Sequence, residues 1–242
     1  MKNTVVITGG TSGIGLALAK RFLDGGDVTI ICGRNSSKLQ QTAAEHPGLH
    51  TILADVSREQ DRHSLFETVK ADYPEANILI NNAGIQQKLD VSSMDWDAWK
   101  AELETNLNAP IQLCGLFVPF FAEKEHAQII NVSSGLAFRP PIWAPVYGAT
   151  KAGMHSFTFT LREQLRSTGI RVQEVIPPAV GTNLGGGASQ GFGADVDEFA
   201  DSVYQDILAG KEEIGFGYTT GAIDKTRREL ESDAIELSKR FL

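Results

Sequence analysis

Tyr147 and Lys151 stand four residues apart in a stretch that we predict to be helical over 145–167. Residues with this spacing share one face of a helix, so the phenol and the ammonium group would be neighbours. A free tyrosine has a pKa of about 10, and an adjacent cation lowers that pKa by favouring the phenolate. The two residues are therefore a candidate acid–base pair. Taken alone, the spacing is a common accident that a buried tyrosine beside a solvated lysine explains better. Ser134 lies thirteen positions upstream, at a predicted strand end, and its presence favours an active acid–base pair over that alternative.

A glycine-rich segment near the N-terminus is the second candidate for chemistry. It covers Thr8–Gly15 and follows a short β-branched run. Glycine permits a tight turn and lets a phosphate approach the backbone, and the helix that begins here offers free N–H groups and a positive dipole end. The spacing is G-x-x-x-G-x-G rather than G-x-G-x-x-G. With a strand before it and an amphipathic helix after it, the segment is better explained as a dinucleotide-binding turn than as an ordinary glycine-rich connection.

Strand-like and helix-like runs must position these residues, and they alternate along most of the chain. The predicted strands cover 5–8, 28–32, 49–53, 77–81, 129–133 and 171–176, with a last candidate at 214–217. The predicted helices cover about 14–22, 57–72, 95–121, 145–167 and 195–208, with an amphipathic helix in the tail 224–242. Continuous apolar strands that alternate with helices indicate a parallel sheet covered by helices on both faces. We expect one domain over residues 1–242.

Several motifs in chain order resemble those of the short-chain dehydrogenase/reductase family. They are T-G-x-x-x-G-I-G at residues 8–15, N-N-A-G at 81–84, Asn106, Ser133-Ser134, Y-x-x-x-K at 147–151, and a proline turn with threonine at 177–182. The resemblance covers residues 3 to about 182. It implies an α/β fold with a Rossmann-like, doubly wound parallel sheet of about seven strands, and hydride transfer to or from a nicotinamide.

The resemblance implies four catalytic residues: Asn106, Ser134, Tyr147 and Lys151. In the family a serine donates a hydrogen bond to the carbonyl oxygen of the substrate. Ser134 has the family's separation from the tyrosine, and Ser133 is the second choice because alternation along a strand points the two hydroxyls in opposite directions. The family's asparagine disturbs its helix and holds a water that leads to the lysine; a solvated side chain is the alternative for Asn106.

The residues expected to bind the dinucleotide are Gly9, Thr11, Ser12, Gly13, Ile14, Gly15, Arg34, Asp55, Val56, Asn82, Ala83, Gly84, Tyr147, Lys151, Pro177, Val180 and Thr182. Asp55 matches the family's contact to the adenine ring, although a turn-forming or capping aspartate is nearly as good an explanation. NAD enzymes carry an acid at the end of the second strand. Here Gly33 takes that place and Arg34 follows. A guanidinium suits a 2′-phosphate, so we expect NADP(H) rather than NAD(H); a solvated arginine is the alternative.

Three loops line the substrate pocket in the family, and here they are mostly apolar. They contribute Ile85, Gln86, Gln87, Leu136, Phe138, Pro140, Pro141, Ile142, Trp143, Pro178 and Val180. The substrate is therefore expected to be a small, mainly apolar carbonyl or alcohol. The glycine-rich stretch 183–200 predicts a mobile lid, with Phe192 as its anchor on the substrate. The five histidines show no metal-ligand spacing, so no metal site is expected.

Composition limits the partners and the compartment. The net charge of −8 disfavours nucleic acid, and no apolar stretch resembles a signal peptide or a membrane span. Two cysteines form no disulfide framework, which fits the cytoplasm. The family's terminal segment that supports a tetramer is replaced by the charged tail. We therefore expect a homodimer formed through the 95–121 and 145–167 helices.

These expectations converge on an NADP(H)-dependent oxidoreductase that transfers a hydride between a nicotinamide and a small carbonyl or alcohol. A non-catalytic dinucleotide-sensing protein is the alternative. The complete set of Asn106, Ser134, Tyr147 and Lys151 argues against the alternative, because a sensor has no reason to keep all four.

Overall fold

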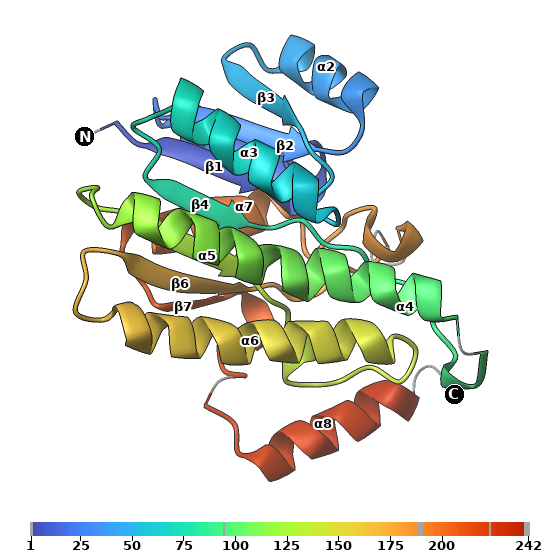
Figure 1. Cartoon of the computed structure of the whole chain (residues 1–242). Helices are drawn as coiled ribbons and strands as arrows, with labels where there is room; N and C mark the ends of the chain where they lie inside the picture. Colours follow the sequence, from blue (N-terminus) through green and yellow to red (C-terminus); the bar gives the residue numbers. More distant parts are fainter. Residues whose placement is uncertain (1, 94, 188–190, 223, 240–242) are drawn as a thin grey trace.

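The computed structural model describes residues 2–93, 95–187, 191–222 and 224–239 (Figure 1). Within these ranges seven strands form one parallel sheet in the order β3-β2-β1-β4-β5-β6-β7. They are β1 (Thr4–Thr8), β2 (Val28–Gly33), β3 (Leu49–Leu53), β4 (Ile78–Asn81), β5 (Gln128–Val132), β6 (Arg171–Ile176) and β7 (Glu213–Gly215). The predicted Rossmann-like sheet of about seven strands is confirmed. The order reverses beside β1, which places a ligand crevice at the carboxyl ends of β1 and β4.

Helices cover both faces of this sheet (Figure 1). They are α1 (Gly13–Asp24), α2 (Ser36–Glu45), α3 (Glu59–Asp72), α4 (Trp96–Leu103), α5 (Ala109–Phe121), α6 (Pro145–Leu165), α7 (Val196–Leu208) and α8 (Arg227–Lys239). One apolar cluster joins the sheet to α1 and α7 through Phe22 and Phe199, and a second joins it to α3 and α5 through Phe66 and Phe117. Because strand side chains alternate between faces, both faces of the central strands are apolar and buried.

The structure differs from the sequence-based prediction in two helical regions. α2 was not predicted, because only Leu39 and Thr42 of its ten residues are buried and the rest show no apolar period. Its start is set locally by Asn35, whose side chain accepts a hydrogen bond from the Lys38 N–H at 2.9 Å.

The predicted helix over 95–121 is interrupted, where the resemblance implies that Asn106 disturbs it: a π-helical segment, Glu104–Asn108, separates α4 from α5. The Ala109 N–H donates to the carbonyl of Glu104, five residues back. Pro110 follows, and it has no N–H for the carbonyl of Asn106 that a regular α-helix would pair with it. The departure from α-helix therefore falls at the one asparagine expected to be catalytic.

The C-terminal region carries the predicted amphipathic helix as α8, which lies outside the sheet and its covering helices (Figure 1). Residues 240–242, the end of that prediction, lie outside the described residues. Lys225, just before α8, forms an ion pair with Asp233 in the middle of α8 at 2.5 Å. This pair links the chain before the helix to the helix itself. No helix among the residues described is both long enough and apolar enough to cross a membrane.

Candidate active site

The four expected catalytic residues are drawn together from three parts of the fold. Ser134 follows β5, Tyr147 and Lys151 lie in the first two turns of α6, and Asn106 lies in the π-helical segment. All four are buried, with exposed fractions between 1% and 7%. Burial strengthens every electrostatic interaction among them, because little water is left to screen it.

Ser134 and Tyr147 face each other, whereas Ser133 points elsewhere. The Ser134 hydroxyl forms a side-chain hydrogen bond with Tyr147 that lowers the pKa of the tyrosine. The Ser133 hydroxyl instead donates toward the carbonyl of Val175 on β6 at 3.4 Å. Consecutive residues at a strand end project to opposite sides, so only one of the two serines can reach the tyrosine. The geometry places Ser134 at the site and Ser133 in the sheet.

The ionisation of Tyr147 differs from the sequence-based expectation. Burial raises the pKa of Tyr147 to about 12, with smaller contributions from Glu102 and Tyr218, and the hydrogen bond to Ser134 opposes the rise. The expected lowering by the lysine is not found in this structure: the groups that shift the pKa of Tyr147 do not include Lys151, whose Nζ lies 5.8 Å from the centre of the tyrosine ring. In this state Tyr147 is a neutral hydrogen-bond donor and not a phenolate.

Lys151 is held at the sheet and not at the tyrosine hydroxyl. Its Nζ donates to the carbonyl of Val132 on β5 at 2.8 Å. Burial lowers the pKa of Lys151 to about 8, and the negative charge of Glu174 on β6 opposes that change. The lysine therefore remains largely protonated at neutral pH.

Asn106 fixes the loop that follows β4. Its Oδ1 accepts from the Ile85 N–H at 2.8 Å, and its Nδ2 donates to the Ile85 carbonyl at 2.8 Å. The same Nδ2 also donates to the Thr150 hydroxyl on α6 at 3.3 Å. The solvated alternative does not hold, because the side chain is 1% exposed and joins a loop to α6. Its catalytic role stays a proposal.

The glycine-rich turn fits tightly against the N-N-A-G motif. Gly9 has a φ of +67°, and a Cβ there would lie 2.9 Å from the Cα of Ala83. The Thr8 hydroxyl accepts from the backbone N–H groups of Asn82 and Ala83, each at 3.0 Å. The Asn82 amide in turn donates to the carbonyl of Thr8 at 2.9 Å. Asn82 therefore braces the turn, and the positive φ of Gly9 together with this close approach requires glycine there.

The last part of the turn leads directly into α1, whose first residue is Gly13. Ser12 precedes the helix and makes no side-chain cap hydrogen bond, so the first N–H groups of α1 (Gly13, Ile14 and Gly15) have no side-chain partner there. A Cβ on Gly13 would lie 3.2 Å from the methyl group of Thr182, which places the segment after β6 against the turn. Such an N-terminus suits an anionic phosphate.

The segment after β6 is tied down at both ends of the glycine-rich loop. Val180 is buried and forms a β-bridge with Ala194, and the Gly181 N–H donates to the Ala194 carbonyl at 2.9 Å. Pro177 is buried at the end of β6, where its carbonyl accepts from the Gly135 N–H at 2.9 Å. Pro177, Val180 and Thr182 therefore lie along the crevice at the carboxyl ends of β1, β4 and β5.

The position expected to select the cofactor lies at the end of β2. A Cβ on Gly33 would lie 3.2 Å from the methyl group of Thr11, so this position borders the glycine-rich turn. Arg34 is exposed beside it. Asp55 forms an Asx turn, accepting from the Ser57 N–H at 3.0 Å and the Ser57 hydroxyl at 2.8 Å, and Val56 is buried behind it. The turn-forming alternative for Asp55 is therefore present, and an adenine contact stays a proposal.

The loops expected to line the substrate pocket meet at the mouth of the site. A Cβ on Gly185 would lie 3.0 Å from the Gln86 side-chain oxygen, and the Leu89 N–H donates to the Trp143 carbonyl at 3.2 Å. Phe192 is 71% exposed, and residues 188–190 of the predicted lid lie outside the described residues.

Two buried carboxyl groups that act on Tyr147 and Lys151 were not predicted from the sequence. Glu102 on α4 accepts from the Gln87 N–H at 2.6 Å, is fully buried, and influences Tyr147. Glu174 on β6 is also fully buried and influences Lys151. For Glu174 the available signal was a carboxylate inside a predicted strand; Glu102, four residues before Asn106, lies in a charged stretch and carried no such signal.

Comparison with known proteins identifies the family. A family profile described as short chain dehydrogenase matches residues 3–195. This chain belongs to the short-chain dehydrogenase family. It is an oxidoreductase of this type, and its fold binds a nicotinamide dinucleotide. The predicted membership is confirmed.

Individual relatives agree with this assignment. The uncharacterized oxidoreductase DltE of Bacillus subtilis is 41% identical over 240 residues, which covers 95% of this chain and 94% of the relative. The NADP-dependent 3-hydroxy acid dehydrogenase YdfG of Escherichia coli (strain K12) is 30% identical over 179 residues, which covers 73% of this chain and 72% of the relative. A solved short-chain dehydrogenase from Sphingobium yanoikuyae in complex with NADPH has a TM-score of 0.83 at 27% identity and covers 96% of both chains.

Proposed function

We propose that this protein is an NADP(H)-dependent oxidoreductase that transfers a hydride between the nicotinamide and a small, mainly apolar carbonyl or alcohol. The observation that supports it most is the buried Ser134–Tyr147 hydrogen bond beside Lys151. A dinucleotide suits the crevice, because the first N–H groups of α1 have no side-chain partner at the cap and are donors for its phosphates. When bound, it supplies or accepts the hydride.

In this proposal the chain's own residues orient the carbonyl and deliver the proton. Ser134 donates a hydrogen bond to the substrate oxygen, and Tyr147 donates its phenolic proton to that oxygen as the hydride reaches the carbon. Lys151 supplies positive charge that stabilises the phenolate left behind. Asn106 holds the loop at Ile85, which borders the space for the substrate. The reverse sequence oxidises an alcohol.

The preference for NADP(H) rests on Arg34 beside Gly33, where no carboxylate would repel a 2′-phosphate. The relative YdfG, named as NADP-dependent, and the neighbour solved with NADPH support the same choice. The apolar residues of the three pocket loops support a substrate without a carboxylate. We further propose a cytoplasmic location, which the two buried, free cysteines support.

A substrate panel tests the proposal. Small ketones, aldehydes and quinones are supplied with NADPH and separately with NADH, and cofactor oxidation is followed by absorbance. We expect turnover of at least one apolar carbonyl, faster at low cofactor concentration with NADPH. Tyr147→Phe is the control: it removes one oxygen, so it should fold and bind cofactor without turnover. A protein that binds NADPH but reduces nothing, in both wild type and variant, would favour the dinucleotide-sensing alternative.

A further inference from the structure

A row of polar side chains crosses the sheet under α5 and α6. Asn81, Asn131, Glu174 and Glu213 are paired in register on β4, β5, β6 and β7. The Asn81 amide donates to Asn131 Oδ1 at 2.9 Å, and the Asn131 amide donates to the Thr158 hydroxyl on α6 at 3.0 Å. Burying such groups costs free energy unless each is compensated, so a fully buried carboxylate in this row needs explaining.

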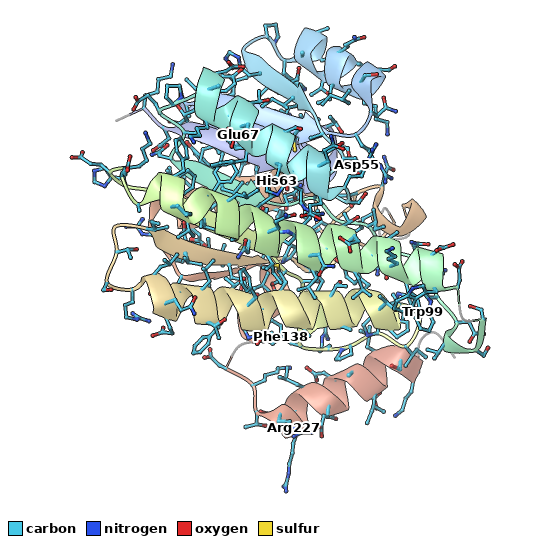
Figure 2. All side chains as sticks on the ribbon, viewed as in Figure 1. Asp55, His63, Glu67, Trp99, Phe138 and Arg227 are labelled. Atoms are coloured by element: carbon cyan, nitrogen blue, oxygen red, sulfur yellow. The ribbon has the colours of Figure 1, made fainter. Side chains whose placement is uncertain are left out.

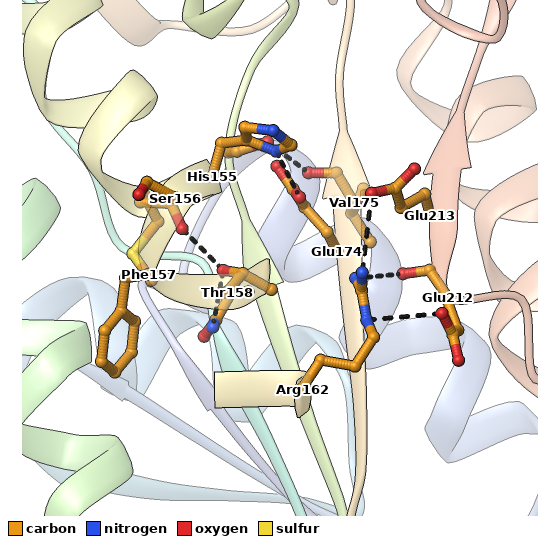
Figure 3. Close-up of polar contacts among 12 residues, drawn as sticks. His155, Ser156, Phe157, Thr158, Arg162, Glu174, Val175, Glu212 and Glu213 are labelled. Carbon is orange, nitrogen blue, oxygen red and sulfur yellow. Dashed lines mark hydrogen bonds and ion pairs between the residues drawn. The ribbon is translucent and has the colours of Figure 1, made fainter. Parts of the chain in front are cut away.

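Glu174 is the least compensated member of the row. It is fully buried, and His155 Nδ1 lies 2.9 Å from its Oε2 (Figure 3). Its Oε1 has no hydrogen-bond partner among the described residues. His155 stands four residues after Lys151, so both lie on the face of α6 that covers β6. The carboxylate therefore contacts His155, which is 30% exposed, and its charge acts on Lys151.

The other cation of the cluster is occupied elsewhere. The Arg162 guanidinium donates to the backbone carbonyls of Val172 and Glu212 at 3.0 and 2.9 Å. It also lies 3.5 Å from a carboxylate oxygen of Glu213 and 3.8 Å from one of Glu212 (Figure 3). Arg162 thus neutralises the acids of β7, which leaves Lys151 and His155 as the charges available to Glu174.

We propose that Glu174 is a positioning residue for the proposed reaction, a fixed counter-charge behind Lys151 that is held in place by His155. Desolvation drives Lys151 toward the neutral amine, and the carboxylate opposes this change. His155 donates to one carboxylate oxygen and leaves the other free. Its own pKa is raised, chiefly by that hydrogen bond. The pair thereby keeps the ammonium charge that the tyrosine needs when it gives up its proton.

The charged and titratable groups around Glu174 come from three elements. They are Lys151, His155 and Arg162 on α6, Glu212 just before β7, and Glu213 on β7. His155, Glu174 and Glu213 also present ligand atoms within 4.8 Å of one another, as a divalent cation requires. Such an ion would add two positive charges beside Arg162 and Lys151 and would replace the proton shared by His155. The surrounding charge therefore favours the ion-pair assignment over a metal site.

The test measures the titration of Lys151 directly in the intact protein, so it does not depend on finding a substrate. Lysine labelled with ¹³C at Cε is followed by NMR, and the Lys151 signal is assigned by its loss in Lys151→Arg. In Glu174→Gln, which keeps the shape and removes the charge, we expect the pKa of Lys151 to fall by about one unit or more. The pKa of His155 should fall in the same variant.

Glu213→Gln is the matched control, since it removes a carboxylate of the same cluster that pairs with Arg162. This variant should lower the pKa of Lys151 by less than half as much as Glu174→Gln does. Glu174→Asp keeps the charge and should restore most of the shift, and it also serves if the glutamine variant folds poorly. Equal titration of Lys151 in wild type and Glu174→Gln, or equal effects of the two glutamine variants, would overturn the proposal.

Two further outcomes separate this proposal from its competitors. If Zn²⁺ shifts the His155 signal at low ratio and a chelator reverses it, the cluster is a metal site and the ion-pair assignment is wrong. If no carbonyl is reduced by the wild type, the proposed function fails while the Lys151 titration still decides the role of Glu174. With an active substrate, the alkaline loss of kcat should begin at lower pH in Glu174→Gln, by the same interval as the NMR shift.

Discussion

Glu102 is a buried acid whose ionisation opposes folding. Burial raises its pKa from 4.5 to about 7, and the hydrogen bond from Gln87 opposes the rise only in part. Because the folded pKa is the higher one, the stabilising contribution of Glu102 is complete below about pH 4.5. It is lost as the pH rises through about 7, where a buried charge must form.

Glu102→Gln should therefore stabilise the protein at alkaline pH. The amide oxygen can still accept from the Gln87 N–H, and no charge forms. We expect the variant to exceed the wild type by about 1–3 kcal/mol at pH 8 and by little at pH 5, measured by urea unfolding. Glu67→Gln, at an exposed glutamate on α3 (Figure 2), is the control and should show no such pH dependence. A pH-independent difference would contradict the shifted ionisation.

Arg34 carries the choice of cofactor in a single side chain. Replacing it by alanine should remove charge-assisted hydrogen bonds to a 2′-phosphate, worth about 1.5–3 kcal/mol, and weaken NADPH binding roughly ten- to a hundredfold. NADH has no such phosphate, so its affinity should change little. Both cofactors are titrated by fluorescence, and Arg227→Ala, at a side chain 91% exposed on α8, controls for the loss of one cation. Equal wild-type affinities for both cofactors would refute the assignment.

The loop between β6 and α7 is the element expected to move. Its ends are tied by the Val180–Ala194 bridge, whereas Gly185, Gly186 and Gly187 all have positive φ values, between 61° and 80°. α7 begins at Val196 with Asp195 as its cap, and Phe199 and Val203 are fully buried. The described part of the loop between Val180 and Ala194 therefore has little packing to hold it in place.

Hydrogen exchange tests the lid proposal. Amides of residues 184–187 and 191–193 should exchange fast in the free protein and at least tenfold more slowly with NADPH and a substrate bound. The amides of Gly181 and Ala194, which donate to backbone carbonyls at 2.9 and 2.8 Å, should be slow in both states and are the internal control. Slow exchange of the whole loop without ligand would make it a rigid wall instead.

At the scale of the whole molecule, local signals predicted the sheet, because the central strands β1, β2 and β4 carry apolar runs that can be recognised without their neighbours. The glycine turn and the Tyr147–Lys151 spacing are local in the same sense. The π-helical segment at Asn106 was not local: it depends on Pro110 and on the loop that Asn106 binds. Nor were the neighbours of Glu174, since strand pairing and α6 bring them together. The predicted lowering of the pKa of Tyr147 was wrong for the same reason, because burial, which depends on the whole fold, sets that pKa.

At the scale of the whole molecule, the outer face of α5 and α6 is the surface through which we expect two copies to associate. α5 and α6 cover one face of the sheet (Figure 1), and they expose Ile111 and Phe159 at 37% and 53%. We propose that the homodimer forms through these helices around a two-fold axis. Each of these residues would then meet the same patch of the partner, so one substitution acts twice.

Phe159→Asp should therefore convert the dimer to a monomer. Removing one phenyl group from each protomer forfeits about 3–6 kcal/mol of apolar burial, which weakens association at least a hundredfold. Light scattering after size-exclusion chromatography at several concentrations measures the mass. Leu208→Asp is the matched control, because Leu208 is equally exposed at 54% but lies at the end of α7, on the opposite face of the sheet. If Leu208→Asp dissociates the protein and Phe159→Asp does not, the interface lies on the α7 face.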